Sequence, residues 1–201
     1  MASVKRGLTL GRNLVTNVVF LGAPCSGKTT IAERLAREFG ALWMPEYGRE
    51  YWEAHQVNRR LTPEQLVEIA EGHIEREDAL LEKSNRYLFT DTNAITTAIF
   101  ARYYHGEIDP RLAALAHQAV TRYDLVFVCD IDIPYDDTWD RSGEVNRAIL
   151  QQQVIADLHE RQVPFLVLRG SLEERVARVR RVLNRFRKHT NVLELSEGAL
   201  P

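Results

Sequence analysis

Short apolar runs alternate along the chain with longer stretches whose apolar residues recur at helical spacing. Apolar runs of this length, bounded by polar residues, are typical of buried strands. The predicted strands span residues 18–21, 41–44, 87–91, 125–129 and 163–168. The main predicted helices span residues 28–39, 62–81, 94–104, 112–120, 145–160 and 172–186. This alternation predicts an α/β fold in which one parallel five-stranded sheet carries helices on both faces.

Two predicted helix boundaries carry capping signals. Gly40 follows the helix 28–39 and is typical of a left-handed C-terminal cap. Thr62 precedes Pro63, and Gln65 stands three residues after Thr62, as in a capping box at a helix start. Both boundaries are therefore predicted independently of the apolar spacing.

The segment between the first strand and the first helix matches the phosphate-loop pattern G-x-x-x-x-G-K-[ST]. It reads Gly22-Ala23-Pro24-Cys25-Ser26-Gly27-Lys28-Thr29 and is followed by Thr30. The two glycines let the backbone turn tightly and bring N–H groups close to phosphate oxygens. Lys28 supplies a mobile cation for the outer phosphates, and the Thr29 hydroxyl is placed to bind Mg²⁺. The strand before the loop and the helix after it disfavour a chance glycine-rich turn, so residues 22–30 are predicted to bind ATP or GTP with magnesium.

Two carboxylates follow predicted strands, at the sheet edge where α/β folds bind ligands. Asp91 closes the third strand and takes the position of the second magnesium-site carboxylate of a phosphate-loop protein. The alternative is that Asp91 or Thr92 caps the helix 94–104. Glu46 follows the second strand, and it is either a site residue or an acid of the next helix's first turn. Both interpretations of Glu46 are retained.

A polar segment from Asp130 to Gly143 separates the fourth strand from the next helix. A loop of this length in a compact domain is usually functional. Arg141, and Arg147 just beyond it, are candidates to close over phosphates during transfer. The alternative is a solvated connection. The arginines of the last predicted helix, Arg175 among them, are interpreted as a solvated face.

Composition narrows the class of protein and of partner. With 201 residues, 45% apolar and 27% charged, the chain has the size and balance of one globular domain. Residues 17–188 are assigned to it, 1–16 to a loose N-terminal extension and 189–201 to a C-terminal tail. The net charge of −2 offers no general attraction for nucleic acid or anionic membranes, and no apolar run reaches the length of a signal-peptide core or a membrane span. The two cysteines give neither a disulfide framework nor a zinc spacing, so a cytoplasmic protein is expected.

Five motifs give a more specific resemblance; in chain order they are GAPCSGKTT, PEYGREY, LFTDTNAITT, DDTWDRSG and VPFLVL. Together, over roughly residues 17–186, they resemble the ribosylnicotinamide kinase domain of NadR-type proteins, a branch of phosphate-loop small-molecule kinases. The resemblance implies a P-loop NTPase-type fold that uses ATP and Mg²⁺ to phosphorylate the ribose 5′-hydroxyl of nicotinamide riboside, giving nicotinamide mononucleotide for NAD synthesis. One departure is Asn93, where similar proteins often carry a second aspartate.

The resemblance also implies roles for individual residues. The implied catalytic residues are Lys28, Glu46, Asp91 and Arg141, the last as the arginine of a lid loop. The implied substrate-binding residues are Glu46, Tyr47, Arg49, Asp91 and Thr92, and the implied Mg²⁺ ligands are Thr29 and Asp91. Aromatic candidates for stacking on a pyridinium cation are Trp43, Tyr47, Trp52 and Trp139. Asp91 and Glu46 are alternative candidates for the carboxylate that takes the acceptor's proton.

Two other function classes are retained as alternatives. One is a phosphate-loop kinase for another nucleoside or small metabolite, and the other is a nucleotide-dependent binding module or switch. No N-K-x-D guanine motif follows the fourth strand, which counts against a GTP switch. The oligomeric state does not follow from the sequence.

Overall fold

The computed structural model describes residues 15–55, 60–135, 144–186 and 188. Its five strands are all parallel and lie in the order β2-β3-β1-β4-β5. They are β1 (Thr16–Leu21), β2 (Leu42–Met44), β3 (Tyr87–Asp91), β4 (Leu125–Cys129) and β5 (Leu166–Leu168). The predicted α/β fold with a parallel five-stranded sheet is therefore confirmed.

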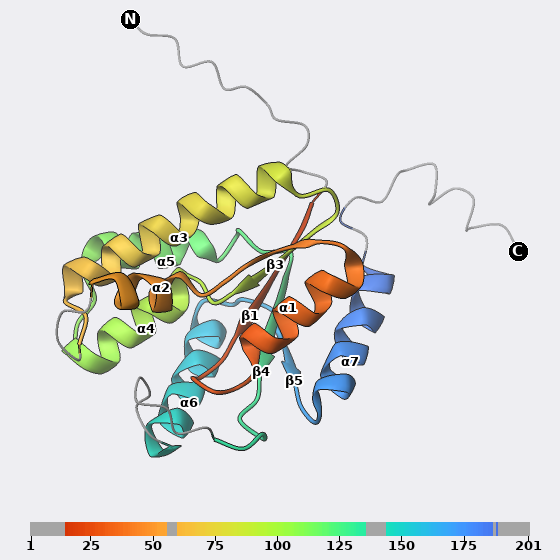
Figure 1. Cartoon of the computed structure of the whole chain (residues 1–201). Coiled ribbons are helices and arrows are strands. Elements are labelled where there is room, and N and C mark those ends of the chain that lie inside the picture. Colours follow the sequence, from red (N-terminus) through yellow and green to blue (C-terminus); the bar gives the residue numbers. More distant parts are fainter. Residues whose placement is uncertain (1–14, 56–59, 136–143, 187, 189–201) are drawn as a thin grey trace, which may run out of the picture.

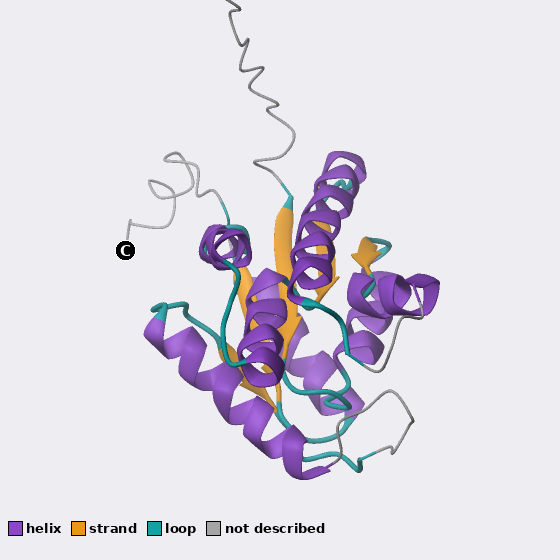
Figure 2. Cartoon of the chain, turned by 90° about the vertical axis from the view of Figure 1, so that its left-hand side faces the viewer, coloured by secondary structure: helices purple, strands orange, loops and turns teal. Residues whose placement is uncertain are grey.

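Helices cover both faces of this sheet, as predicted. They are α1 (Lys28–Phe39), α2 (Tyr47–His55), α3 (Pro63–Lys83), α4 (Ala94–His105), α5 (Pro110–Ala119), α6 (Glu144–Glu160) and α7 (Leu172–Arg185). Figure 1 shows α1 and α7 on one side of the strands and α3, α4, α5 and α6 on the other. In the turned view of Figure 2, helices again flank the strands.

The two faces of the sheet build two hydrophobic cores. Successive side chains of a strand point to opposite faces, so Phe20 of β1 joins the core under α1 and α7 while Val19 and Leu21 join the other. The Phe20 ring lies between Phe89 and Phe127, with ring centroids 6.3 and 5.7 Å away. Because β1 is central and buried along its whole length, the loop that follows it starts from a fixed position.

A buried carboxylate joins α3 to the amino end of β1. Glu77 is fully buried and accepts hydrogen bonds from Asn17 Nδ2 at 3.0 Å and from Arg122 Nη2 at 2.9 Å. The Tyr123 hydroxyl donates to its other oxygen at 2.6 Å, and His73 Nε2 lies 3.5 Å from that oxygen. Burial acts to raise the pKa of Glu77, but these partners outweigh it and hold the pKa below its ordinary value. The charge is therefore retained and fully compensated inside the protein.

Capping signals predict helix ends well here. The capping box of Thr62 and Gln65 is formed in both directions, and Gly40 takes a left-handed conformation with φ of 59°. β5 is shorter than predicted, because the Val163 N–H bonds to Leu158 O at the end of α6 and Pro164 has no N–H to pair. β1 starts two residues earlier than predicted.

The remaining predicted boundaries concern the ends of the chain. Most of the predicted N-terminal extension and all of the C-terminal tail lie outside the described residues. Within the described ranges, no helix combines the length and apolar character that crossing a bilayer requires.

Candidate active site

The phosphate loop joins β1 to α1 in a conformation that needs glycine at both of its fixed positions. Gly22 has φ of 137°, and a Cβ there would lie 2.6 Å from the backbone oxygen of Cys129 in the neighbouring strand β4. Gly27 has φ of 84° and caps α1. Residues with a Cβ rarely adopt either backbone conformation, so the backbone itself explains why both positions of the motif are glycine.

The open side of this loop presents backbone donors. In the part of the chain that the structure describes, the N–H groups of Ser26 and Gly27 have no hydrogen-bond acceptor. They stand at the N-terminus of α1, where the helix dipole favours an anion. Lys28 is predicted to be a mobile cation, but its side chain is only 8% exposed and its Nζ donates to Ala23 O at 2.9 Å. The ammonium is thus already held inside the loop.

Asp91 and the phosphate loop meet at the carboxyl ends of β3 and β1. The Thr29 hydroxyl donates to Asp91 Oδ2 at 2.5 Å, and the Asp91 side chain is fully buried. Burial, with the nearby charge of Glu46, raises the pKa of Asp91 to about 6, against the opposing effects of Lys28 and the Thr29 hydroxyl. A buried carboxylate whose ionised form is disfavoured is typical of a functional site.

The alternative interpretation of this motif as a helix cap is wrong for both Asp91 and Thr92. Asn93 caps α4, because its Oδ1 accepts hydrogen bonds from the N–H groups of Ile95 and Thr96. Thr92 has φ of 66°, which a β-branched residue rarely adopts, and its N–H donates to Phe20 O in β1. Asparagine at position 93 therefore supplies the cap, and Asp91 is left for the site.

The pair of Thr29 and Asp91 fits a magnesium ion. Mg²⁺ prefers oxygen ligands and usually takes only one or two carboxylates, completing its shell with phosphate and water. Asp91 Oδ1 is buried and has no hydrogen-bond partner among the described residues, which leaves a hard acceptor for a cation. The described ranges contain no group of three or more acidic, histidine or cysteine side chains that could hold a metal without such help.

The EYGRE element follows β2. Glu46 directly precedes α2 and is half-buried, close enough for its charge to act on Asp91. Tyr47 opens α2 and packs its ring against Gly72 of α3, with the guanidinium carbon of Arg76 4.0 Å from the ring centre. Arg49 is exposed on the same helix. The structure thus brings Glu46 to Asp91, whereas the Tyr47 ring is engaged by α3.

Three polar residues that bind the phosphate loop do not follow from the motif. Gln151 of α6 accepts from Ala23 N–H at 2.8 Å and donates to Cys129 O at 3.1 Å. Arg147, on the same helix, donates to Cys25 O at 3.0 Å and to Ile133 O at 2.9 Å.

Arg175 of α7 is the third of these residues. It is 3% exposed and donates to Ser26 O at 2.7 Å. The prediction of a solvated face is therefore wrong for Arg175. Neighbouring arginines of α7, such as Arg178 and Arg181, are exposed as predicted.

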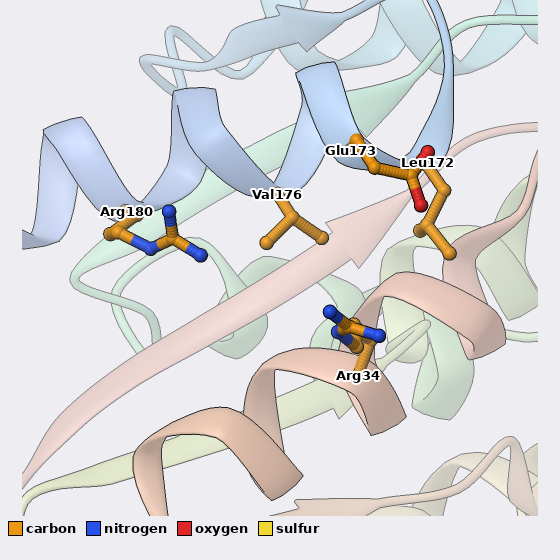
Figure 3. A pocket seen from close by; sticks show the side chains of 5 residues that line it. All are labelled: Arg34, Leu172, Glu173, Val176 and Arg180. Carbon is orange, nitrogen blue, oxygen red and sulfur yellow. The ribbon is translucent and has the colours of Figure 1, made fainter.

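Two predicted residues and one surface hollow lie outside the candidate site as the structure describes it. Arg141 and Trp139 lie outside the described residues. A hollow of about 200 Å³ between α1 and α7 is shown in Figure 3; it is lined by Arg34, Leu172, Glu173, Val176 and Arg180. It is smaller than typical ligand pockets and contains no residue of the phosphate loop, so it is not the candidate site.

Residues 17–175 match a protein family described as AAA domain. The chain belongs to this AAA domain family. The AAA domain is 30% identical over 156 residues to the trifunctional NAD biosynthesis/regulator protein NadR of Escherichia coli (strain K12), and this match covers 76% of the chain and 38% of that relative. The chain therefore spans well under half the length of the curated relative, while its motif resemblance to NadR is confirmed.

Solved structures share the fold of this AAA domain. The NadR protein in complex with NR superposes with a TM-score of 0.68 at 24% identity, covering 80% of this chain and 45% of that one. Deoxyadenosine kinase from M. mycoides superposes with a TM-score of 0.60 at 14% identity, covering 85% and 100%. At such identities the likeness establishes the fold alone.

Proposed function

We propose that this chain is an ATP-dependent kinase that phosphorylates the ribose 5′-hydroxyl of nicotinamide riboside to give nicotinamide mononucleotide. The observation that carries the proposal is the hydrogen bond between Thr29 and Asp91, which joins the phosphate loop to the acid motif after β3. Similarity to NadR, which is named as a NAD biosynthesis protein, supports the substrate class. A neighbour of the same fold in complex with NR supports it further.

The triphosphate binds to the phosphate loop in this proposal. The N–H groups of Ser26 and Gly27 donate to phosphate oxygens, and the N-terminus of α1 adds its dipole. Lys28 exchanges its bond to Ala23 O for an outer phosphate oxygen, which places its charge where negative charge spreads during transfer. Thr29 and Asp91 hold the magnesium ion, which when bound neutralises phosphate charge and orients the transferring group.

The acceptor hydroxyl is assigned to Glu46. Asp91 already accepts from Thr29 on one oxygen and offers the other to a cation, so it is engaged on the nucleotide side. Glu46 lies at the end of the neighbouring strand β2 and is half-buried, with its charge close to Asp91. It orients the 5′-hydroxyl and takes its proton as the hydroxyl oxygen bonds to the γ-phosphorus of ATP. The bond from that phosphorus to the β-phosphate oxygen breaks, and ADP leaves. Tyr47 and Arg49 border this position as residues of the same element.

Two buried polar atoms beyond Asp91 supply hydrogen bonds for the acceptor. Asn93 Nδ2 and Thr96 Oγ1 are buried and have no partner among the described residues. An unsatisfied buried polar group costs about 1–3 kcal/mol, so such groups usually await a ligand or water. We assign them to hydroxyl groups of the ribose. Arg141, outside the described residues, is proposed to neutralise phosphate charge in the transition state.

The test is an acceptor panel with the purified chain, ATP and Mg²⁺, read by mass spectrometry. Nicotinamide riboside should gain one phosphate, and the product should be nicotinamide mononucleotide. The fold likeness to a deoxyadenosine kinase makes a different nucleoside the second candidate, so deoxyadenosine and other nucleosides belong in the panel. A phosphorylated nucleoside other than nicotinamide riboside refutes the substrate, and ATP hydrolysis without any phosphorylated acceptor refutes the kinase assignment.

A further inference from the structure

Two buried arginines from different helices hold neighbouring carbonyl groups of the phosphate loop. Arg147 of α6 donates to Cys25 O, and Arg175 of α7 donates to Ser26 O, at 3.0 and 2.7 Å. Both side chains are 3% exposed. The two helices pack on opposite faces of the sheet, so the loop is held from both sides.

These bonds set the direction of the loop's donors. In a trans peptide the C=O and N–H groups point in opposite directions, because the unit is planar. Arg147 holds Cys25 O and thereby turns the Ser26 N–H away from itself. Arg175 holds Ser26 O and turns the Gly27 N–H away in the same manner. Both N–H groups stand among the donors at the N-terminus of α1 that have no backbone acceptor within the described residues.

The Arg175 guanidinium is held by several protein groups in this arrangement. Its Nε donates to Gly170 O at 2.9 Å, and its Nη2 donates to Asp130 O at 3.2 Å and to the Asp132 carboxylate. With Nη1 on Ser26 O, all three nitrogens are engaged. A planar guanidinium can bridge three such segments at once, whereas a lysine ammonium is a single point of donation.

We propose that Arg147 and Arg175 are positioning residues that set the affinity of the phosphate loop for a triphosphate through the two carbonyl groups that they hold. The proposal rests on the nucleotide-binding part of the proposed function and is independent of the acceptor. It also explains why two buried guanidinium groups lie behind a loop whose own Lys28 already supplies a cation.

The test uses Arg175→Lys, which keeps the charge and removes the fork. We expect MgATP binding, measured by calorimetry without acceptor, to weaken about tenfold or more, since lost hydrogen bonds to charged donors are worth about 1.5–3 kcal/mol. Magnesium tripolyphosphate should weaken by the same factor, because only the phosphate loop is affected. Arg147→Lys should behave alike, and the double variant should lose less than the product of both factors, because the two arginines act on adjacent peptides.

Two control variants lie on α7. Arg178→Lys changes an exposed arginine and should leave the affinity unchanged. Val179→Ala removes packing at a fully buried position and should lower the melting temperature without weakening MgATP binding. If Arg175→Lys does not fold, Arg147→Lys tests the same claim from the other helix.

Several results would overturn the proposal. Full affinity in Arg175→Lys with a loss in Arg175→Met would mean that charge alone matters. A loss for ATP but not for tripolyphosphate would indicate a contact to the nucleoside. An equal loss in Val179→Ala would indicate general destabilisation. Wild-type protein that binds neither ligand refutes this proposal together with the nucleotide site, whereas wild-type protein that binds MgATP but phosphorylates no riboside refutes the proposed substrate alone.

Discussion

Asp91→Asn tests whether Asp91 is a magnesium ligand or a structural residue. If Asp91 is a magnesium ligand, the substitution should abolish turnover while stabilising the fold. Asn93 caps α4, so the substitution at Asp91 removes no helix cap. Asparagine keeps an oxygen that accepts from the Thr29 hydroxyl, and the side-chain shape is retained. What is lost is one negative charge in a fully buried position.

The size of the stabilisation follows from the pKa of Asp91. Burial raises this pKa from its ordinary value of 3.8 to about 6. Each pKa unit is worth about 1.4 kcal/mol, so the ionised carboxylate costs the metal-free protein roughly 3 kcal/mol at pH 7. The new amide N–H groups also need partners, and an unpaired one costs about 1–2 kcal/mol, which reduces the expected gain to about 1–2 kcal/mol. For a chain of this length we expect the melting temperature to rise by roughly 5 °C.

The pH dependence of the free energy of unfolding shows whether the charge of Asp91 stabilises or destabilises the folded protein. Below pH 3.8 the carboxyl is neutral in both folded and unfolded protein, and wild type and variant should differ least. The wild type loses stability relative to the variant as pH rises from there to about 6, and the difference is constant above that pH.

The assay combines thermal melts in EDTA across this pH range with turnover in MgATP. Asn93→Ala is the control, and by losing the cap it should lower stability by about 1 kcal/mol. A variant at Asp91 that melts lower than wild type and still turns over would refute the assignment of Asp91 to the metal.

Three other substitutions test separate parts of the account. Lys28→Ala should abolish phosphate transfer and change the melting temperature little, since it removes one bond to Ala23 O. Phosphate transfer is measured by mass spectrometry of the product, and transfer at the wild-type rate would contradict the assignment of the phosphate loop. Glu77→Ala should lower the free energy of unfolding in urea by about 3 kcal/mol, because Asn17, Tyr123 and Arg122 lose the buried acceptor that they share, although Arg122 keeps its ion pair with Asp78. MgATP affinity should be unchanged. The contribution of Glu77 should be present above its ordinary pKa of 4.5 and be lost as pH falls below that value. Thr96→Val should raise the KM for the acceptor about tenfold, by loss of a hydrogen bond. Thr97→Val is its matched control, since that hydroxyl already donates to Asn93 O, and equal effects in both would refute the assignment of Thr96.

Local signals account for the parts of the fold that the sequence predicts correctly. The helix 28–39 is predicted residue by residue, because the phosphate loop starts it and a left-handed Gly40 ends it. The strand 87–91 is predicted as closely, since a polar turn follows it. β5 is overestimated because its first predicted residue bonds to the end of α6, a contact between elements that apolar spacing does not contain.

Local sequence signals predict one part of the candidate site and miss the other. Its motif residues are contiguous in sequence, so the phosphate loop and Asp91 are predicted from the pattern alone. Their supporting partners are remote, since Arg175 lies 149 positions from Ser26 and Gln151 lies 128 positions from Ala23. The sequence around Arg175 and Gln151 does not indicate which loop these residues contact.

A signal for these remote partners nevertheless exists in the helical spacing. Arg175 stands four residues before Val179 and eight before Leu183, both buried in the core of α7, so it occupies the apolar stripe of that helix. Arg147 stands three residues before Leu150 and four before Gln151 on α6, and all three are buried.

The same helical spacing identifies Glu77, the buried carboxylate that joins α3 to β1. It lies seven residues after Ala70 and four after His73 on the buried face of α3. A charged residue in an apolar stripe is buried unless the helix rotates, and burial of a charge is tolerated only when it is paired and hydrogen-bonded. Position on the stripe therefore identifies which charges must have partners inside the protein. The partner itself follows only from the packing, which is why Glu77 supports the fold while Arg147 and Arg175 support the phosphate loop.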